Sequence, residues 1–184
     1  MNITCIRHLP TKWNRAGKLQ GLKDIPITAI TKDLEKQIRQ NLRKIYSCSR
    51  PDIVLASTLT RTRQTAEFYG FTPAVDELLN ELSFGPFEGM EKSQFAKAAG
   101  KLWLTKPSAS VLGKEVRNLE KRIKLFVQKY KLNNHVLLFG HGAWIRALLS
   151  LVYYGDIDRM NQLSVKNNDC IHIRRKQIVR FFNL

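Results

Sequence analysis

Short apolar runs alternate with longer amphipathic stretches along this chain. The runs at 3–6, 52–56 and 136–139 have the length and the aliphatic character of strands. The third run is apolar throughout, which is typical of a strand that helices bury on both faces. Strands that alternate with helical stretches indicate a layered α/β fold.

The stretches between the runs predict helices. Apolar residues recur at helical spacing from 34 to 45, behind Thr31 as an N-cap, and again over residues 116–130. Three further helices are expected, over 61–69, over 143–153 and, with a weaker pattern that has Gly100 near its end, over 91–104.

The C-terminal stretch has a different pattern. Residues 170–182 alternate around Lys176 and Gln177, which predicts a hairpin with exposed basic positions. No repeat, low-complexity tract or linker interrupts the chain. We therefore expect one domain over 1–184, a three-layer α/β sandwich with a mostly parallel central sheet and a C-terminal hairpin or edge strand.

Composition narrows the class of protein. The 184 residues are 43% hydrophobic and 25% charged, which is neither a disordered nor a membrane composition. No apolar run approaches the roughly 18 residues of a spanning helix, and the N-terminal residues do not form a signal peptide. We therefore expect a cytoplasmic protein without a membrane span. The three scattered cysteines predict neither a disulfide framework nor a metal knuckle.

Charge is the outlier of the composition. The 31 Lys and Arg residues exceed the 15 Asp and Glu residues, for a formal net charge of +16. Such an excess attracts nucleic acid, an anionic membrane surface or phosphorylated substrates, and it can also be only a solvated basic face. Charge alone does not choose among these.

Groups that suit phosphate follow each predicted strand. They are Arg7 and His8, then Ser57, Thr58 and Arg61, then Gly140, His141 and Gly142. Ligands of open α/β sheets bind beyond the carboxyl ends of the strands, so two imidazoles and two guanidiniums should meet at one edge, facing each other across a phosphate-sized gap. The helices after the second and third strands should add free N–H groups. One histidine alone would be an ordinary structural residue, and it is the convergence that favours a phosphate site.

Four motifs, in order, resemble the histidine phosphatase superfamily, the phosphoglycerate mutase-like proteins. They are RHLPTKWN at 7–14 with Gln20-Gly21, STLTRTRQTA at 57–66, ELSFGPFEG at 81–89, and FGHG at 139–142. Each motif alone is modest evidence, but the ordered set spans most of the chain and is specific. The resemblance implies the phosphoglycerate mutase-like fold.

The resemblance also implies roles. His8 would attack phosphorus and form a phosphohistidine, while Glu81 would protonate the leaving oxygen and then activate water. Arg7, Arg61 and His141 would hold the phosphoryl oxygens. The substrate-binding residues would be Thr11, Asn14, Gln20, Gly21 and Gly142. No cofactor or metal is expected, and the six-residue spacing of His135 and His141 fits no helical pair of metal ligands.

Three features qualify this resemblance. Glu77 is a rival for the proton donor, although the spacing to Gly85 favours Glu81. Leu9 stands where the family usually has a small residue, and it would be strained if that position needed positive φ. The segment expected to cover the site is short and basic, which suggests a preference for anionic substrates; its lysines are Lys92, Lys97, Lys101 and Lys106.

The sequence thus favours a phosphomonoesterase that acts on a small phosphorylated molecule through phosphohistidine. One alternative is a phosphoglycerate mutase, which must shield its intermediate from water and usually has longer insertions than 184 residues allow. Another alternative is a basic domain of low activity that binds phosphorylated ligands or nucleic acid. The pair of His8 and His141, together with Glu81, argues against a protein that only binds.

Overall fold

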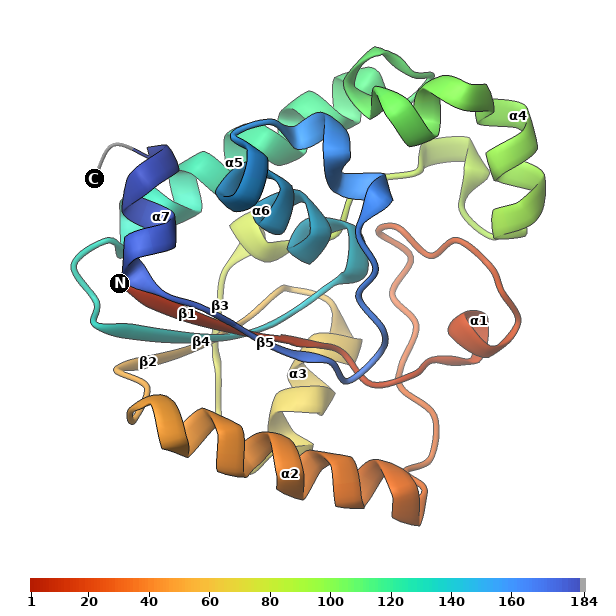
Figure 1. The fold of residues 1–184 in the computed structure, drawn as a ribbon. Helices are drawn as coiled ribbons and strands as arrows, with labels where there is room; N and C mark the ends of the chain where they lie inside the picture. Colours follow the sequence, from red (N-terminus) through yellow and green to blue (C-terminus); the bar gives the residue numbers. More distant parts are fainter. Residues whose placement is uncertain (183–184) are drawn as a thin grey trace.

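The computed structural model describes residues 1–182 and has a five-stranded central sheet (Figure 1). The strand order is β3-β2-β4-β1-β5, with β1 at Asn2–Arg7, β2 at Ile53–Ala56, β3 at Ala74–Val75, β4 at His135–Gly140 and β5 at Cys170–Ile173. Every pairing is parallel except that of β5, which runs antiparallel to β1 at the edge. The mostly parallel α/β sheet expected from the sequence is confirmed.

Helices cover both faces of the sheet. In Figure 1, α2 (Lys32–Cys48) and α3 (Thr60–Phe68) lie on one face, and α5 (Gly113–Tyr130), α6 (Gly142–Tyr154) and α7 (Arg175–Phe182) lie on the other. Two further helices, α1 (Lys12–Arg15) and α4 (Lys92–Thr105), lie toward the end of the sheet where β1 leads into α1. Within residues 1–182 no helix combines the length and the apolar character needed to cross a membrane.

The buried strand β4 divides the core in two. All six of its residues are buried, and its side chains alternate between two hydrophobic clusters. Val136 and Leu138 join the cluster under α5 and α6, whereas Leu137 and Phe139 join the cluster under α2 and α3. The continuous apolar run in the sequence therefore reflects a strand covered on both faces.

The expected C-terminal hairpin is wrong in its second half. β5 is an edge strand, but the chain then forms the helix α7, which buries Ile178 against the core. A tight hairpin favours Gly, Asn or Asp at its turn, and residues 176 and 177 are Lys and Gln instead. Over so few residues, an alternating pattern does not separate a strand from an amphipathic helix.

The other predicted helices are present, and most of their ends lie within one or two residues of the predicted positions. Thr31 caps α2 by accepting a hydrogen bond from the backbone N–H of Leu34 at 3.3 Å. Gly100 interrupts α4 with a φ of +68°, a conformation that glycine adopts without strain, and this explains the weak helical pattern there.

Candidate active site

The register of the sheet brings the three strand exits to one edge. Arg7, the last residue of β1, pairs with Gly140 of β4, and Ala56 at the end of β2 pairs with Phe139. Each strand therefore ends at the same level. The residues that follow enter one region, and they are His8, Ser57 and His141.

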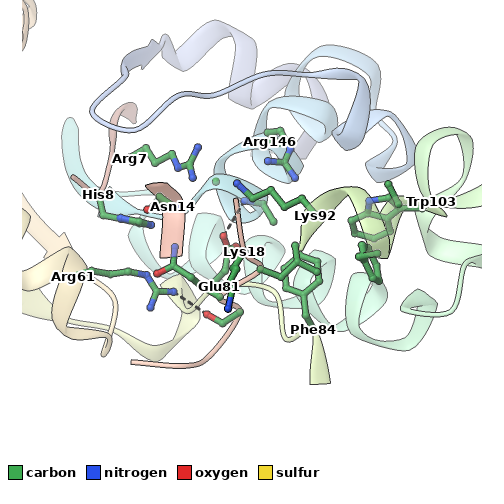
Figure 2. A pocket seen from close by; sticks show the side chains of 17 residues that line it. Arg7, His8, Asn14, Lys18, Arg61, Glu81, Phe84, Lys92, Trp103 and Arg146 are labelled. Atoms are coloured by element: carbon green, nitrogen blue, oxygen red, sulfur yellow. Dashed lines mark hydrogen bonds between the residues drawn. The ribbon is translucent and has the colours of Figure 1, made fainter. Parts of the chain in front are cut away.

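A cavity of about 320 Å³ opens at this edge (Figure 2). Eight of the ten predicted site residues line it: Arg7, His8, Asn14, Gln20, Gly21, Arg61, Glu81 and Gly142. The other two, Thr11 and His141, are fully buried behind the cavity wall.

His8 presents one ring nitrogen to the cavity. Its Nδ1 lies 2.7 Å from the carbonyl oxygen of Leu9, which can only accept, so the proton of the neutral ring is on Nδ1 and Nε2 keeps its lone pair. Burial lowers the pKa of His8 well below 6.5, and the positive charges of Arg61 and Arg7 lower it further. At neutral pH the ring is therefore uncharged.

Arg7 is a half-buried cation with free donors. Its Nη1 donates to the carbonyl oxygen of Val165 at 2.6 Å, while its Nε is buried and has no partner among residues 1–182. Burial lowers the pKa of Arg7 to about 10, so the group stays charged at neutral pH. A methyl group at position 142 would lie 3.1 Å from Cζ of Arg7, so the guanidinium would have to move by a few tenths of an ångström to make room for it.

Arg61 is held in place by the loop before α2. Its Nη2 donates to the carbonyl oxygen of Gly21 and its Nη1 to that of Lys23, both at 2.8 Å. Gly21 has a φ of +54°, and a side chain there would also collide with the carboxylate of Glu88. Burial lowers the pKa of Arg61 from its usual value. The predicted Gln20-Gly21 motif therefore helps to position a guanidinium as well as lining the cavity.

His141 lies behind Arg61, and the expected gap between the two histidines is wrong. The rings of His8 and His141 pack edge to face, with centroids 5.4 Å apart. Nε of Arg61 donates to Nδ1 of His141 at 3.3 Å, so Nε2 carries the proton and donates to Oγ of Ser57 at 2.7 Å. Ser57 in turn touches Oγ1 of Thr62 at 2.9 Å. Both ring nitrogens of His141 are thus engaged by the protein.

Carboxylates already occupy part of the two helix N-termini at this edge, contrary to expectation. Backbone amides of Ala143 and Trp144, in the first turn of α6, donate to the two carboxylate oxygens of Glu81, both at 3.0 Å. The first amide of α3, that of Thr60, donates to Asp24 at 2.8 Å. A carboxylate favours the positive end of a helix dipole as an external anion would, which explains the arrangement.

A network of hydrogen bonds beside the cavity orients the side-chain amide of Asn14. Oδ1 of Asn14 accepts from the backbone N–H of Thr11 at 3.1 Å and from Nδ2 of Asn167 at 3.3 Å. Both are donors, which identifies this atom as the oxygen and leaves Nδ2 of Asn14 free. Thr11 also donates from its hydroxyl to Oε1 of Gln20 at 2.9 Å. Thr11 therefore orients two cavity residues without reaching the cavity itself.

The structure adds residues that the sequence reasoning missed. Arg146 and Lys18 line the cavity, and so does an aromatic wall formed by Phe84, Phe95 and Trp103. Helical spacing could have revealed Arg146, because it follows Gly142 by four residues on the same helix face. Of the lysines in the expected basic cover, Lys92 lines this cavity, and the others do not.

The structure also places Glu77 and Leu9, the other two qualifying features. Glu77 is exposed and lines a second cavity, which Glu81 also borders, whereas Glu81 is the one of the two that lines the cavity beside His8. Leu9 has an ordinary φ, since Asn168 is the sole non-glycine residue of 1–182 with a positive one, and its side chain is buried in the core. Within the same residues, no three His, Cys, Asp or Glu side chains gather in a way that could hold a metal ion.

Known proteins resemble this chain over most of its length. The family model described as "Histidine phosphatase superfamily (branch 1)" matches residues 3–178. "Uncharacterized phosphatase PhoE" of Bacillus subtilis is 32% identical over 162 residues, covering 85% of this chain and 80% of its own. "Probable phosphoglycerate mutase GpmB" of Erwinia tasmaniensis is 24% identical, covering 96% and 86%. A crystal structure of a protein from Thermus thermophilus aligns with a TM-score of 0.70 at 28% identity, covering 95% of this chain and 96% of that one.

Proposed function

This chain belongs to the histidine phosphatase superfamily, branch 1, and we propose that it is a phosphomonoesterase that works through a phosphohistidine on His8. The relatives of this family include proteins named as phosphatases and as mutases. Hydrolysis is proposed here because the relative with the higher identity of the two is named a phosphatase.

In the first step, Nε2 of His8 attacks phosphorus and the bond from phosphorus to the ester oxygen breaks. The proposal rests on one observation: the hydrogen bond from Nδ1 to Leu9 leaves the Nε2 lone pair free in a cationic cavity. The lowered pKa of His8 keeps that lone pair unprotonated at neutral pH. Covalent catalysis of this kind divides one difficult displacement into two easier ones.

The charge that spreads over the phosphoryl oxygens needs donors fixed in advance. Arg7 and Arg61 supply guanidinium groups, and Asn14 supplies its free Nδ2 amide. His141 acts as a positioning residue in this proposal, because it touches Arg61 and His8 and not the cavity. Each donor is already held by backbone carbonyls or buried side chains, so little reorganisation is required.

Glu81 moves the protons. It takes up a proton from solvent when the substrate binds and gives that proton to the leaving ester oxygen, and the alcohol departs. Its carboxylate then takes a proton from water, the hydroxide attacks phosphorus, and the bond from phosphorus to His8 breaks to release phosphate. Glu81 is the carboxyl group that lines this cavity within residues 1–182, and a positioned acid contributes about 10²–10⁴-fold to such a step.

The test is to trap the intermediate. Brief incubation with a radiolabelled phosphomonoester, followed by alkaline denaturation, should give an acid-labile label on the wild-type protein and none on His8→Ala. His172→Ala is the matched control and should keep the label. Label that persists in His8→Ala would overturn the proposal, and exchange between 2- and 3-phosphoglycerate without free phosphate would favour a mutase instead.

A further inference from the structure

We infer that Arg146 and Lys92 form a second anion-binding subsite in this cavity, so that the substrate is a phosphomonoester with a second anionic group. This inference rests on the proposed phosphatase function and names its substrate class. The second group would be a carboxylate or a further phosphate, attached a few bonds from the phosphoryl group that is transferred.

Arg146 is held rigidly with one face toward the cavity. Its Nε donates to the carbonyl oxygen of Met160 and its Nη2 to Oδ1 of Asn161, both at 3.2 Å. Its Nη1 is left over, and this atom would lie 3.5 Å from a methyl group at position 142. The same methyl group would meet Arg7, so two guanidiniums approach one glycine.

Lys92 brings a third cation to the same region. In Figure 2 its side chain extends from the start of α4 toward the space between Arg7 and Arg146. Its ammonium has no hydrogen bond or ion pair with any residue of 1–182. Desolvation lowers the pKa of Lys92, and repulsion from Arg7 and Arg146 lowers it further. Glu81 offsets part of the charge of Arg7 and Arg146, but the charges that act on Lys92 are those of the two arginines. A bound anion therefore relieves a repulsion that Glu81 leaves in place.

The charge of the cavity exceeds what one phosphate needs. Five cationic side chains and one carboxylate line it, a formal charge of +4 with both histidines neutral. A phosphomonoester dianion pairs with Arg7 and Arg61 beside His8. The remaining cations, Arg146 and Lys92 foremost, are left to bind a second anion, and a guanidinium binds a carboxylate or a phosphate with two parallel hydrogen bonds.

The aromatic wall limits what lies between the two anions. Phe84 packs edge to face against Phe95 and Trp103, with centroids 5.7 and 6.0 Å apart. With a volume of about 320 Å³, the cavity suits a short carbon skeleton against these rings. The substrate class is therefore a compact bis-anionic phosphomonoester.

Matched substrate pairs test the subsite. 3-Phosphoglycerate and glycerol 3-phosphate differ by a carboxylate in place of a hydroxymethyl group. Propane-1,3-diol bisphosphate and its monophosphate differ by the second phosphate. We expect the wild type to prefer the more charged member of at least one pair by about 10–100-fold in kcat/KM, the value of one or two charge-assisted hydrogen bonds. The pair that shows the preference identifies the second anion.

Two variants locate the preference. Arg146→Gln and Lys92→Met should each bring the ratio of kcat/KM within the pair close to one, with a smaller effect on p-nitrophenyl phosphate. Lys97→Met is the matched control, because it removes a lysine of the same helix that does not line the cavity. Lys92 is at the helix start, so its variant remains informative if Arg146→Gln fails to fold.

The outcomes separate the subsite from the proposed function. Hydrolysis without preference in either pair, or a preference that survives both variants, overturns the subsite and leaves the phosphatase intact. If no compound is hydrolysed, the same pairs are titrated calorimetrically against His8→Ala. Tighter binding of the charged member, lost on Arg146→Gln or Lys92→Met, supports the subsite although the proposed function has failed, and equal binding overturns both.

Discussion

The four histidines of this chain form two pairs, one just beyond β1 and β4 and the other on β4 and β5, and the pairs have opposite designs. The rings of His8 and His141 are 5.4 Å apart beyond the carboxyl ends of β1 and β4. The rings of His135 and His172 are 5.8 Å apart, on either side of the hydroxyl of Thr4 in β1. Ring distance is therefore a poor guide to which pair could do chemistry.

The two pairs differ in the hydrogen bonds and the charges around their ring nitrogens. Nδ1 of His135 donates to the carbonyl oxygen of Ser49 at 2.9 Å, and its Nε2 accepts from the hydroxyl of Thr4 at 2.7 Å. Nδ1 of His172 then donates to Thr4 at 3.0 Å, so Thr4 joins the two rings into what we call the closed pair, which does not line the cavity. His8 by contrast keeps a lone pair in a cavity lined by cations. A free nitrogen in a strong field, and not the histidine itself, marks the candidate nucleophile.

The largest expected effect is the loss of kcat when the proposed nucleophile is removed. His8→Ala removes the proposed nucleophile and should lower kcat on p-nitrophenyl phosphate by roughly four orders of magnitude or more. His172→Ala, in the closed pair, should keep kcat within about twofold. Steady-state phosphate release measures both, and circular dichroism checks that both fold. Comparable losses in the two variants would show that the contrast between the pairs has no catalytic meaning.

A smaller effect concerns the serine beside each pair. Ser57→Ala removes the acceptor for Nε2 of His141 and frees that ring to turn away from Arg61, so kcat/KM should fall by about 10–100-fold. Ser49→Ala removes only a hydroxyl contact to His135 and should leave kcat/KM unchanged. A positioning role further predicts that Ser57→Thr, which keeps a hydroxyl, restores part of the activity. Equal rates for Ser57→Ala and the wild type would contradict it.

Much of the fold could be predicted because strong patterns coincide with strong physical constraints. The run at 136–139 is apolar on both faces, and the stripe over 116–130 is long enough to fix a helical period. The prediction for the C-terminal segment was wrong because α7 has only eight residues and buries only Ile178, which is too short a stretch to distinguish the two periods.

The site could be predicted only where it follows strand ends or recognisable motifs. Arg7, His8 and Glu81 could be found in this way, and they line the cavity. The contact of Arg146 with the cavity could not be predicted. An arginine inside an apolar helix indicates which face of the helix it lies on, but not what that face meets in the fold. The capping of α6 by Glu81 was equally hidden, because it joins residues 62 positions apart.

The pair of His135 and His172 should contribute to stability and not to catalysis. His135→Leu keeps the bulk of the side chain but leaves the hydroxyl of Thr4 and the carbonyl of Ser49 without their partner. The free energy of unfolding should fall by about 1–3 kcal/mol, while kcat per folded molecule stays at the wild-type value. Urea unfolding and active-site titration measure the two quantities. A loss of kcat without a loss of stability would reverse the assignment of the two pairs.

The smallest expected effect is the dependence of stability on pH. Burial lowers the pKa of all four histidines below the ordinary value of about 6.5, so the unfolded chain binds protons that the folded chain does not. The stabilising contribution of each is therefore complete above about pH 7 and declines as the pH falls below 6.5 toward the folded pKa.

His172 is the least enclosed of the four, and repulsion from His135 and Arg174 adds to the lowering of its pKa. His172→Gln should reduce the slope of unfolding free energy between pH 7 and 5 slightly, and His135→Leu should reduce it more. Urea midpoints at pH 7.5, 6.5 and 5.5 give these slopes, and a steeper slope in either variant than in the wild type would contradict the neutral, closed pair.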